Sequence, residues 1–227
     1  MPLRAVVFDF DGVIANSEPL HLRAFQDVLA SEHVTLTHDE YYARYLGFDD
    51  AGVFRMIGEA CGAAFSTEQI AELVARKAVR MEALEKDVSV LFPGAAETIR
   101  RLARSLPLAV ASGALGAEIR RVLDRAKLTA CFAAIVSAED TPASKPAPDP
   151  YLRAVQQLSA SVREPLSPGD CVAVEDSVWG LESARTAGLR TVAVAQTYPP
   201  AALSAADLVV TSVHELTHET LARLWSD

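Results

Sequence analysis

The sequence of 227 residues has few cysteines and no long apolar run. Its three cysteines, Cys61, Cys131 and Cys171, are far apart, which excludes a disulfide framework and a CxxC metal knuckle. We expect them to be buried thiols of a protein in the reducing cytoplasm. No run reaches the roughly 18 apolar residues of a membrane span. Asp9 and Asp11 interrupt the first apolar run, which is not the pattern of a signal peptide, so we expect a soluble protein without a membrane partner.

Basic charge is also scarce. The chain has 21 Lys plus Arg against 30 Asp plus Glu, a formal net charge of −9. Nucleic-acid binding requires basic stripes, and the sequence shows none, so we exclude nucleic acid as a partner. Half of the residues are apolar and 22% are charged, which is typical of a folded protein. The length suits one large domain, or a domain with an insert, and a monomer is the default expectation.

Short, almost continuous apolar runs recur along the chain and are typical of strands buried on both faces of a parallel sheet. The runs are 5–8, 108–111, 134–136, 171–174, 191–194 and 208–210. Helical patterns separate the later runs, at 94–105, 117–126, 149–158 and 177–187. Alternating strands and helices predict an α/β fold with a doubly wound, Rossmann-like parallel sheet.

The segment after the first strand breaks this alternation, because it contains helical patterns only. The predicted helices are 18–30, 39–46, 50–60 and 68–86. Two helix starts carry capping boxes, Thr37 with Glu40 and Ser66 with Gln69. The division predicted is a core of residues 1–16 and 92–227 with an inserted helical cap of residues 17–91. We expect the cap to lie over the carboxyl end of the first strand, where ligands bind in open α/β sheets.

Polar residues follow four of the predicted strands. They are Asp9 and Asp11, then Ser112 and Gly113, then Lys145, and finally Glu175 and Asp176. The carboxyl ends of parallel strands share one edge of a sheet, so we expect these groups in one crevice. Four carboxylates repel one another unless a cation joins them, and oxygen ligands suit Mg²⁺. With the Lys145 charge, the Ser112 hydroxyl and helix-start amides as further donors, the pattern predicts a site for phosphoryl transfer.

The two aspartates of the first motif can divide this chemistry. Asp9 would attack phosphorus and form an aspartyl-phosphate. Asp11 would protonate the leaving oxygen and then deprotonate the water that hydrolyses the intermediate. Gly12 would allow the chain to turn sharply after the strand.

The ordered motifs resemble the haloacid dehalogenase superfamily, and within it the β-phosphoglucomutase-like phosphatases, which carry a helical cap inserted after the first motif. The matching segments are Asp9-Phe10-Asp11-Gly12-Val13, Ser112, Lys145 within 143–149, and Val174-Glu175-Asp176-Ser177. The resemblance implies that Mg²⁺ is bound by the Asp9 side chain, the Asp11 carbonyl and the Asp176 side chain, with support from Glu175. Dehalogenases of this superfamily lack the second acid, so Asp11 argues against that reaction.

One departure from the resemblance favours hydrolysis. The sugar mutases carry Leu-Lys-Gly-x-x-Arg in the cap, whereas this chain has Tyr45-Leu46-Gly47-Phe48-Asp49-Asp50. Both cations are missing, and Asp50 takes the place of the arginine. We therefore expect a Mg²⁺-dependent phosphatase of a small phosphorylated metabolite, such as a sugar phosphate.

The phosphomutase remains the alternative, because other cap cations can substitute for the missing ones. The cap candidates for substrate binding are Arg44, Arg76 and Lys77, with Arg55 as a further cation, and Gly113 is the substrate-binding candidate in the core. His21 matches the mutase-like pattern after the first motif and is a candidate for positioning Asp11 or the substrate.

Two other functions are less well supported. A phospho-accepting signalling module also combines paired acids, an acceptor aspartate and a lysine, but it is shorter and has no helical insert. The segment His214-Glu215-Leu216-Thr217-His218 fits the zinc-protease pattern HExxH. On a single helix, an apolar stripe from Val213 to Leu224 would leave both histidines on the polar side, and a capping box with Ser212 accounts for Glu215.

Overall fold

The computed structural model describes residues 3–46, 48–62, 64–86 and 89–225. It divides into two compact units. The core unit comprises Met1–Asn16 and Leu91–Asp227, and the cap unit comprises Ser17–Val90. Gly47, within the cap segment compared with the mutase motif, lies outside the described residues. None of the helices in these ranges has both the length and the apolar content to cross a membrane.

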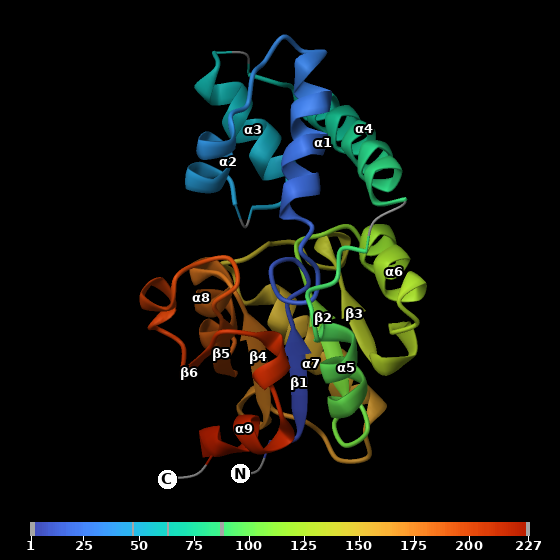
Figure 1. Cartoon of the computed structure of the whole chain (residues 1–227), viewed down its shortest axis with the longest axis vertical. Helices are drawn as coiled ribbons and strands as arrows, with labels where there is room; N and C mark the ends of the chain where they lie inside the picture. Colours follow the sequence, from blue (N-terminus) through green and yellow to red (C-terminus); the bar gives the residue numbers. More distant parts are fainter. Residues whose placement is uncertain (1–2, 47, 63, 87–88, 226–227) are drawn as a thin grey trace. The chain divides into compact units, whose positions relative to one another are not determined.

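The core unit is built on one parallel sheet with the strand order β3-β2-β1-β4-β5-β6 (Figure 1). The strands are β1 (Ala5–Phe8), β2 (Leu108–Ala111), β3 (Ala134–Val136), β4 (Cys171–Glu175), β5 (Arg190–Val194) and β6 (Leu208–Val210). Every residue of β1, β2 and β4 is buried, which explains why β1 and β2 are apolar throughout and β4 is apolar up to its last residue, Glu175. The doubly wound α/β fold predicted from the sequence is confirmed.

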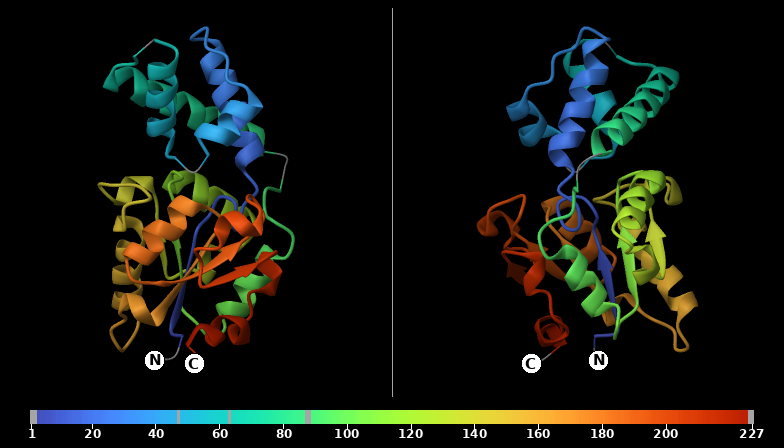
Figure 2. Two further views of the ribbon diagram at one scale, coloured as in Figure 1. Left: turned by 90° about the vertical axis from the view of Figure 1, so that its left-hand side faces the viewer. Right: turned by 45° about the vertical axis from the view of Figure 1, so that its right-hand side comes forward.

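Helices cover both faces of this sheet (Figure 2). They are α5 (Ala95–Leu102), α6 (Gly116–Arg125), α7 (Asp149–Ser161), α8 (Val178–Thr186) and α9 (His218–Ala222). Helix α7 packs on β1, β2 and β3, and α8 beside it packs on β4 and β5, while α5 lies on the opposite face. The direction of winding reverses between β1 and β4, so a binding crevice is expected outside the carboxyl ends of these two strands.

The described part of the cap unit is helical, as predicted. It contains α1 (Glu18–Ala30), α2 (His38–Arg44), α3 (Asp50–Ala60) and α4 (Thr67–Glu85). Both predicted capping boxes are present, at Thr37 before α2 and at Ser66 before α4. Helix α4 packs on α1 and α3, and the ring of Phe25 lies 5.8 Å from that of Tyr41 and 5.0 Å from that of Phe54.

The prediction of three buried thiols was wrong for two of them. All three cysteines are free, but only Cys171 is buried, while Cys131 is half-buried and Cys61 is exposed. Cys61 is the residue that caps the carboxyl end of α3, so it lies where the apolar face of that helix has ended. Burial raises the pKa of the Cys171 thiol to about 12, which makes it chemically inert.

The prediction of a single helix through the HExxH segment was also wrong. His214 lies in a 3-10 turn (Val213–Glu215) and His218 begins α9. Leu216 between them has a ψ of 84°, which is not helical. Ser212 caps the first element and Thr217 caps the second, so two capping residues divide the segment. The histidines therefore do not share one helix face, as a zinc site of that type requires.

Candidate active site

Asp9 is the first residue after β1, and the backbone directs it toward β4. The pairing of Phe8 with Val174 places Asp9 beside Glu175. The Asp9 N–H still donates to the carbonyl of Val174 at 2.9 Å, so the ladder to β4 continues beyond the strand. The carboxylate accepts from the Phe10 N–H at 2.7 Å, and Asp9 is only 8% exposed. The candidate nucleophile is thus buried and held in one orientation.

The chain turns tightly directly after Asp9. The Gly12 N–H donates to the carbonyl of Ala15 at 2.8 Å, and the Ala15 N–H donates to that of Phe10 at 2.9 Å. Gly12 has a φ of +75°, and a Cβ at this position would lie 1.9 Å from a carboxylate oxygen of Asp176. Only glycine fits here, as the sequence predicted. The turn therefore packs directly on Asp176 and carries the half-buried Asp11.

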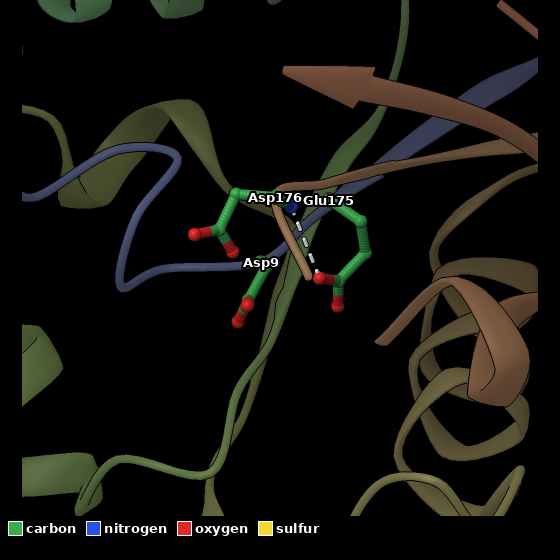
Figure 3. A group of neighbouring side chains, drawn as sticks. All are labelled: Asp9, Glu175 and Asp176. Carbon is green, nitrogen blue, oxygen red and sulfur yellow. Dashed lines mark hydrogen bonds between the residues drawn. The ribbon is translucent and has the colours of Figure 1, made fainter. Parts of the chain in front are cut away.

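Glu175 ends β4 and Asp176 follows it, and both acids lie beside Asp9 (Figure 3). Asp9, Glu175 and Asp176 each offer a carboxylate oxygen, and these atoms lie within 4.8 Å of one another. Glu175 is fully buried, and its Oε2 accepts from the Asp176 N–H at 3.2 Å and the Ser177 hydroxyl at 3.1 Å. We call these three residues the core acid cluster. The sequence predicted these three acids together with a fourth, Asp11, which is not a member of the cluster.

Lys145 supplies the counter-charge. It follows β3 in the chain, and its Nζ lies 2.8 Å from Asp9 Oδ1 and 2.6 Å from Glu175 Oε1. Tyr151 on α7 also donates its hydroxyl to Glu175 Oε1, at 2.6 Å, and Nζ of Lys145 lies 5.3 Å from its ring centroid. Sequence reasoning missed Tyr151, because a buried aromatic residue on a core helix carries no signal of such a contact.

The electrostatics of the core acid cluster favour a bound cation. Burial, together with the charge of Glu175, raises the pKa of Asp9 to about 8 even though Lys145 opposes the shift. Burial disfavours the charge of Lys145, but Asp9 and Glu175 outweigh it and raise the pKa of the lysine. One lysine facing three carboxylates leaves an excess of negative charge. Carboxylate oxygens with this excess charge fit Mg²⁺, which Asp9 and Asp176 would hold.

Ser112 and Gly113 follow β2, which is adjacent to β1 in the sheet. Ser112 is buried, and its hydroxyl accepts from the Ala114 N–H at 3.0 Å. The N-cap residue of α6 is Leu115, so Ser112 orders the connecting turn and does not cap the helix. Gly113 is exposed, and no atom outside its neighbours lies within 4 Å of the position of a Cβ.

Two of the cap candidates lie together in the cap unit. Nζ of Lys77 is 2.6 Å from Nδ1 of His21 and 2.6 Å from Oδ1 of Asp50. The lysine side chain is fully buried, and Nζ lies 4.4 Å from the ring centroid of Phe25. We call His21, Asp50 and Lys77 the cap cluster. Asp50, which takes the place of the mutase arginine, thus forms an ion pair with Lys77.

The other two cap candidates have different surroundings. Arg76 forms an ion pair with Glu32 at 2.7 Å and donates to the hydroxyl of Ser31. The guanidinium of Arg44 lies 5.5 Å from the ring centroid of Tyr45. Substrate binding by these four residues, Arg44, Arg76, Lys77 and His21, and by Gly113 in the core stays a prediction.

Comparison with known proteins agrees with the motifs. The family model described as Haloacid dehalogenase-like hydrolase matches residues 6–194. The chain is 35% identical over 205 residues to Protein CbbY of Rhodobacter capsulatus, covering 87% of this chain and 88% of that protein. It is 32% identical over 223 residues to Hexitol phosphatase B of Escherichia coli strain K12, covering 96% of each.

A solved structure shows the same fold. The β-phosphoglucomutase of Clostridium difficile matches with a TM-score of 0.86 at 20% identity, covering 98% of this chain and 97% of that one. This likeness extends over the core sheet and the inserted helical segment, and the family match also covers most of the chain. The chain therefore belongs to the haloacid dehalogenase-like hydrolases and is an enzyme of the phosphatase type within that family.

Proposed function

We propose that the protein is a Mg²⁺-dependent phosphatase that acts on a small phosphorylated sugar or polyol through an aspartyl-phosphate on Asp9. The observation that carries the proposal is the buried Asp9 carboxylate, held 2.8 Å from Lys145 inside the core acid cluster. A carboxylate fixed beside a cation is suited to attack a phosphorus atom, because the lysine counters the charge of the incoming phosphate.

The chemistry divides into two displacements. In the first, an oxygen of Asp9 forms a bond to phosphorus while the bond to the leaving oxygen breaks, and Asp11 donates its proton to that oxygen. In the second, Asp11 takes a proton from water as the water oxygen bonds to phosphorus. The Asp9–phosphorus bond then breaks and inorganic phosphate is released. Lys145 faces the developing charge in both steps.

The core acid cluster fits Mg²⁺, as its charge excess and oxygen donors indicate. A Mg²⁺ ion held by Asp9 and Asp176 would supply charge neutralisation to the phosphoryl oxygens. Mg²⁺ dependence is general among phosphatases of this family, which supports the same dependence here.

The substrate class is supported by the relatives and the cap. Hexitol phosphatase B is named for a phosphorylated polyol, and it aligns with this chain over almost its whole length. In the cap unit, Lys77 is already paired with Asp50, and Leu46 stands where the mutases carry lysine. The cap thus differs from one built to bind a second phosphate, which favours hydrolysis of a monophosphate.

We further propose the cytoplasm as the compartment, since the three cysteines are free.

Phosphate release from a panel of sugar and polyol monophosphates, with and without Mg²⁺, tests the proposal. We expect steady release that stops when the cation is chelated and resumes when Mg²⁺ is restored. Conversion of β-glucose 1-phosphate to the 6-phosphate in the presence of a bisphosphate primer would instead indicate the mutase. An aspartyl-phosphate that persists for minutes would indicate a signalling module.

A further inference from the structure

Gln196 connects three segments that are far apart in the sequence. It lies two residues beyond the end of β5 and is half-buried. Its Nε2 donates to the carbonyl of Gly12 at 3.0 Å and to that of Val13 at 3.5 Å. Its Oε1 accepts from the Val213 N–H at 3.4 Å. One side-chain amide thus joins the turn after Asp9 to the segment that follows β6.

The orientation of this amide follows from its partners. The NH₂ group faces two carbonyl oxygens, and the oxygen faces an N–H group. A flipped amide would place its oxygen against the carbonyl of Gly12 and its NH₂ against the Val213 N–H, so both interactions would become repulsive. The donor to the turn and the acceptor from Val213 are therefore two separable functions of one side chain.

The turn has two sets of hydrogen bonds, one within the turn itself and one from Gln196 to the carbonyl groups of Gly12 and Val13. The Gly12 N–H and the Ala15 N–H are satisfied inside the turn, by the carbonyls of Ala15 and Phe10. Gly12 and Val13 are buried, and their carbonyls accept from Gln196. A buried carbonyl that loses its donor is costly, so the turn depends on this amide for its native conformation.

The position of this turn matters for the site. Gly12 packs directly on Asp176, since a Cβ on Gly12 would lie 1.9 Å from its carboxylate. Asp11 is the residue before Gly12. A rotation of the turn would therefore displace both Asp11, the candidate general acid, and Gly12, which packs on Asp176. We propose that Gln196 is a positioning residue. The NH₂ group of Gln196 holds the turn at Asp11 and Gly12 in place against Asp176.

The inference rests on the proposed phosphatase for its kinetic readout, and a second readout observes the turn directly. Two substitutions separate the functions of the amide. Gln196→Glu keeps the shape and the oxygen that accepts from Val213 but loses the donor to Gly12. Gln196→Met keeps the length and loses both. Gln26 offers matched controls, because its Nε2 donates to the carbonyl of Leu36 at 2.9 Å and it is also half-buried.

We expect Gln196→Glu and Gln196→Met each to lower kcat by roughly tenfold or more, as for the loss of one hydrogen bond to a buried carbonyl. The KM for the substrate should change less than kcat. In hydrogen exchange followed by mass spectrometry, peptides that cover residues 9–16 should exchange faster, while those covering β4 stay protected. Gln26→Glu and Gln26→Met should leave both readouts at the wild-type level.

Three results would overturn the inference. Wild-type kcat in Gln196→Glu would mean that the side chain serves only as the acceptor from Val213. Unchanged exchange of residues 9–16 in both Gln196 variants would show that the turn does not depend on the amide. Loss of β4 protection in Gln196→Glu would mean a general structural role. If the wild-type protein released no phosphate from any monophosphate, the proposed function would fail, and the exchange measurement would still decide the inference about the turn.

Discussion

The core unit and the cap unit each bury a lysine against acidic partners. In the core, Lys145 lies 2.8 Å from Asp9 and 2.6 Å from Glu175, and Asp176 completes the core acid cluster. In the cap, Lys77 lies 2.6 Å from Asp50 and 2.6 Å from His21. The two lysines are similarly enclosed, with side-chain exposures of 8% and 0%.

The difference lies in the balance of charge. The cap cluster has one lysine for one carboxylate, and the third partner is an imidazole, so it can be neutral without any added ion. The core acid cluster has three carboxylates, and one lysine, Lys145, lies beside it. Buried charge is tolerated only when it is compensated, so the charge balance favours a further cation in the core and not in the cap. The same residue types thus make a charge-balanced ion pair in one unit and a site with excess negative charge in the other.

The largest effect is expected from Asp9→Asn. The amide lacks the nucleophilic carboxylate, so turnover should fall on the order of a thousandfold or more. Steady-state phosphate release measures this loss, and circular dichroism verifies the fold. As a control, Asp27→Asn removes a carboxylate from the cap unit, where Asp27 pairs with Arg80 at 2.7 Å, and should keep wild-type turnover. Substantial activity in Asp9→Asn would exclude Asp9 as the nucleophile.

The two lysines can be compared through stability. Lys145→Met leaves the buried carboxylates of Asp9 and Glu175 without their lysine, so it should lower the free energy of unfolding by about 3 kcal/mol when Mg²⁺ is chelated. Lys77→Met leaves the half-buried carboxylate of Asp50 without its lysine and should have a smaller effect. Urea denaturation in chelator and in Mg²⁺ measures the difference. Mg²⁺ should restore much of the loss in Lys145→Met, because the cation binds the same acids, and none in Lys77→Met. Equal restoration in both variants would contradict the distinction between the clusters.

In the absence of divalent cations, the free energy of unfolding should depend on pH through Asp9 of the core acid cluster. Burial raises the pKa of Asp9 from an ordinary value of 3.8 to about 8, so the folded state holds this proton more tightly than the unfolded state. The resulting stabilisation is fully present below pH 3.8 and is lost as the pH rises to about 8. Between pH 5 and pH 8 in chelator, the wild type should lose about 3.5 kcal/mol relative to Asp9→Asn.

Urea denaturation at the two pH values measures this difference. Asp27→Asn, which leaves Asp9 intact, should keep the wild-type dependence on pH. The same slope in the wild type and in Asp9→Asn would show that Asp9 is not the titrating group.

Much of the fold was predictable because its signals are local. The bounds of β1 and β2 follow from continuous apolar runs, since strands buried on both faces need no polar alternation. The capping boxes at Thr37 and Ser66 placed the starts of α2 and α4 to within one residue. The prediction of one helix through the HExxH segment was wrong because a second capping residue, Thr217, starts a new helix within it.

The site was only partly predictable, because its support is tertiary. Asp9 and Lys145 follow strands and Glu175 ends one, and the order of these strands brings the three residues together, so their motifs were visible. Gln196 contacts Gly12 across 184 residues, and no local pattern marks it. Tyr151 looks like any buried aromatic residue on α7, although its hydroxyl contacts Glu175. Such contacts depend on side-chain directions that only the packed sheet determines.

The smallest effect is expected from Tyr151→Phe, which removes only that hydroxyl. Glu175 Oε1 then loses one of its two side-chain donors and retains Lys145. We expect a loss of about 1 kcal/mol in the free energy of unfolding and a decrease in kcat of roughly fivefold, because Lys145 is less well held beside Asp9. KM should change by less than a factor of about two, because the tyrosine acts through Lys145 and not on the substrate.

Tyr41→Phe in the cap unit is the matched control. Its hydroxyl donates to Glu18 Oε2 at 2.7 Å, so the substitution removes a similar bond between a buried tyrosine and a carboxylate. It should cost about the same stability and leave kcat unchanged. If both variants lost stability and neither lost kcat, Tyr151 would be a packing residue. A decrease in kcat confined to Tyr151→Phe would show that the hydrogen bond from Tyr151 to Glu175 supports catalysis through the core acid cluster in addition to stability.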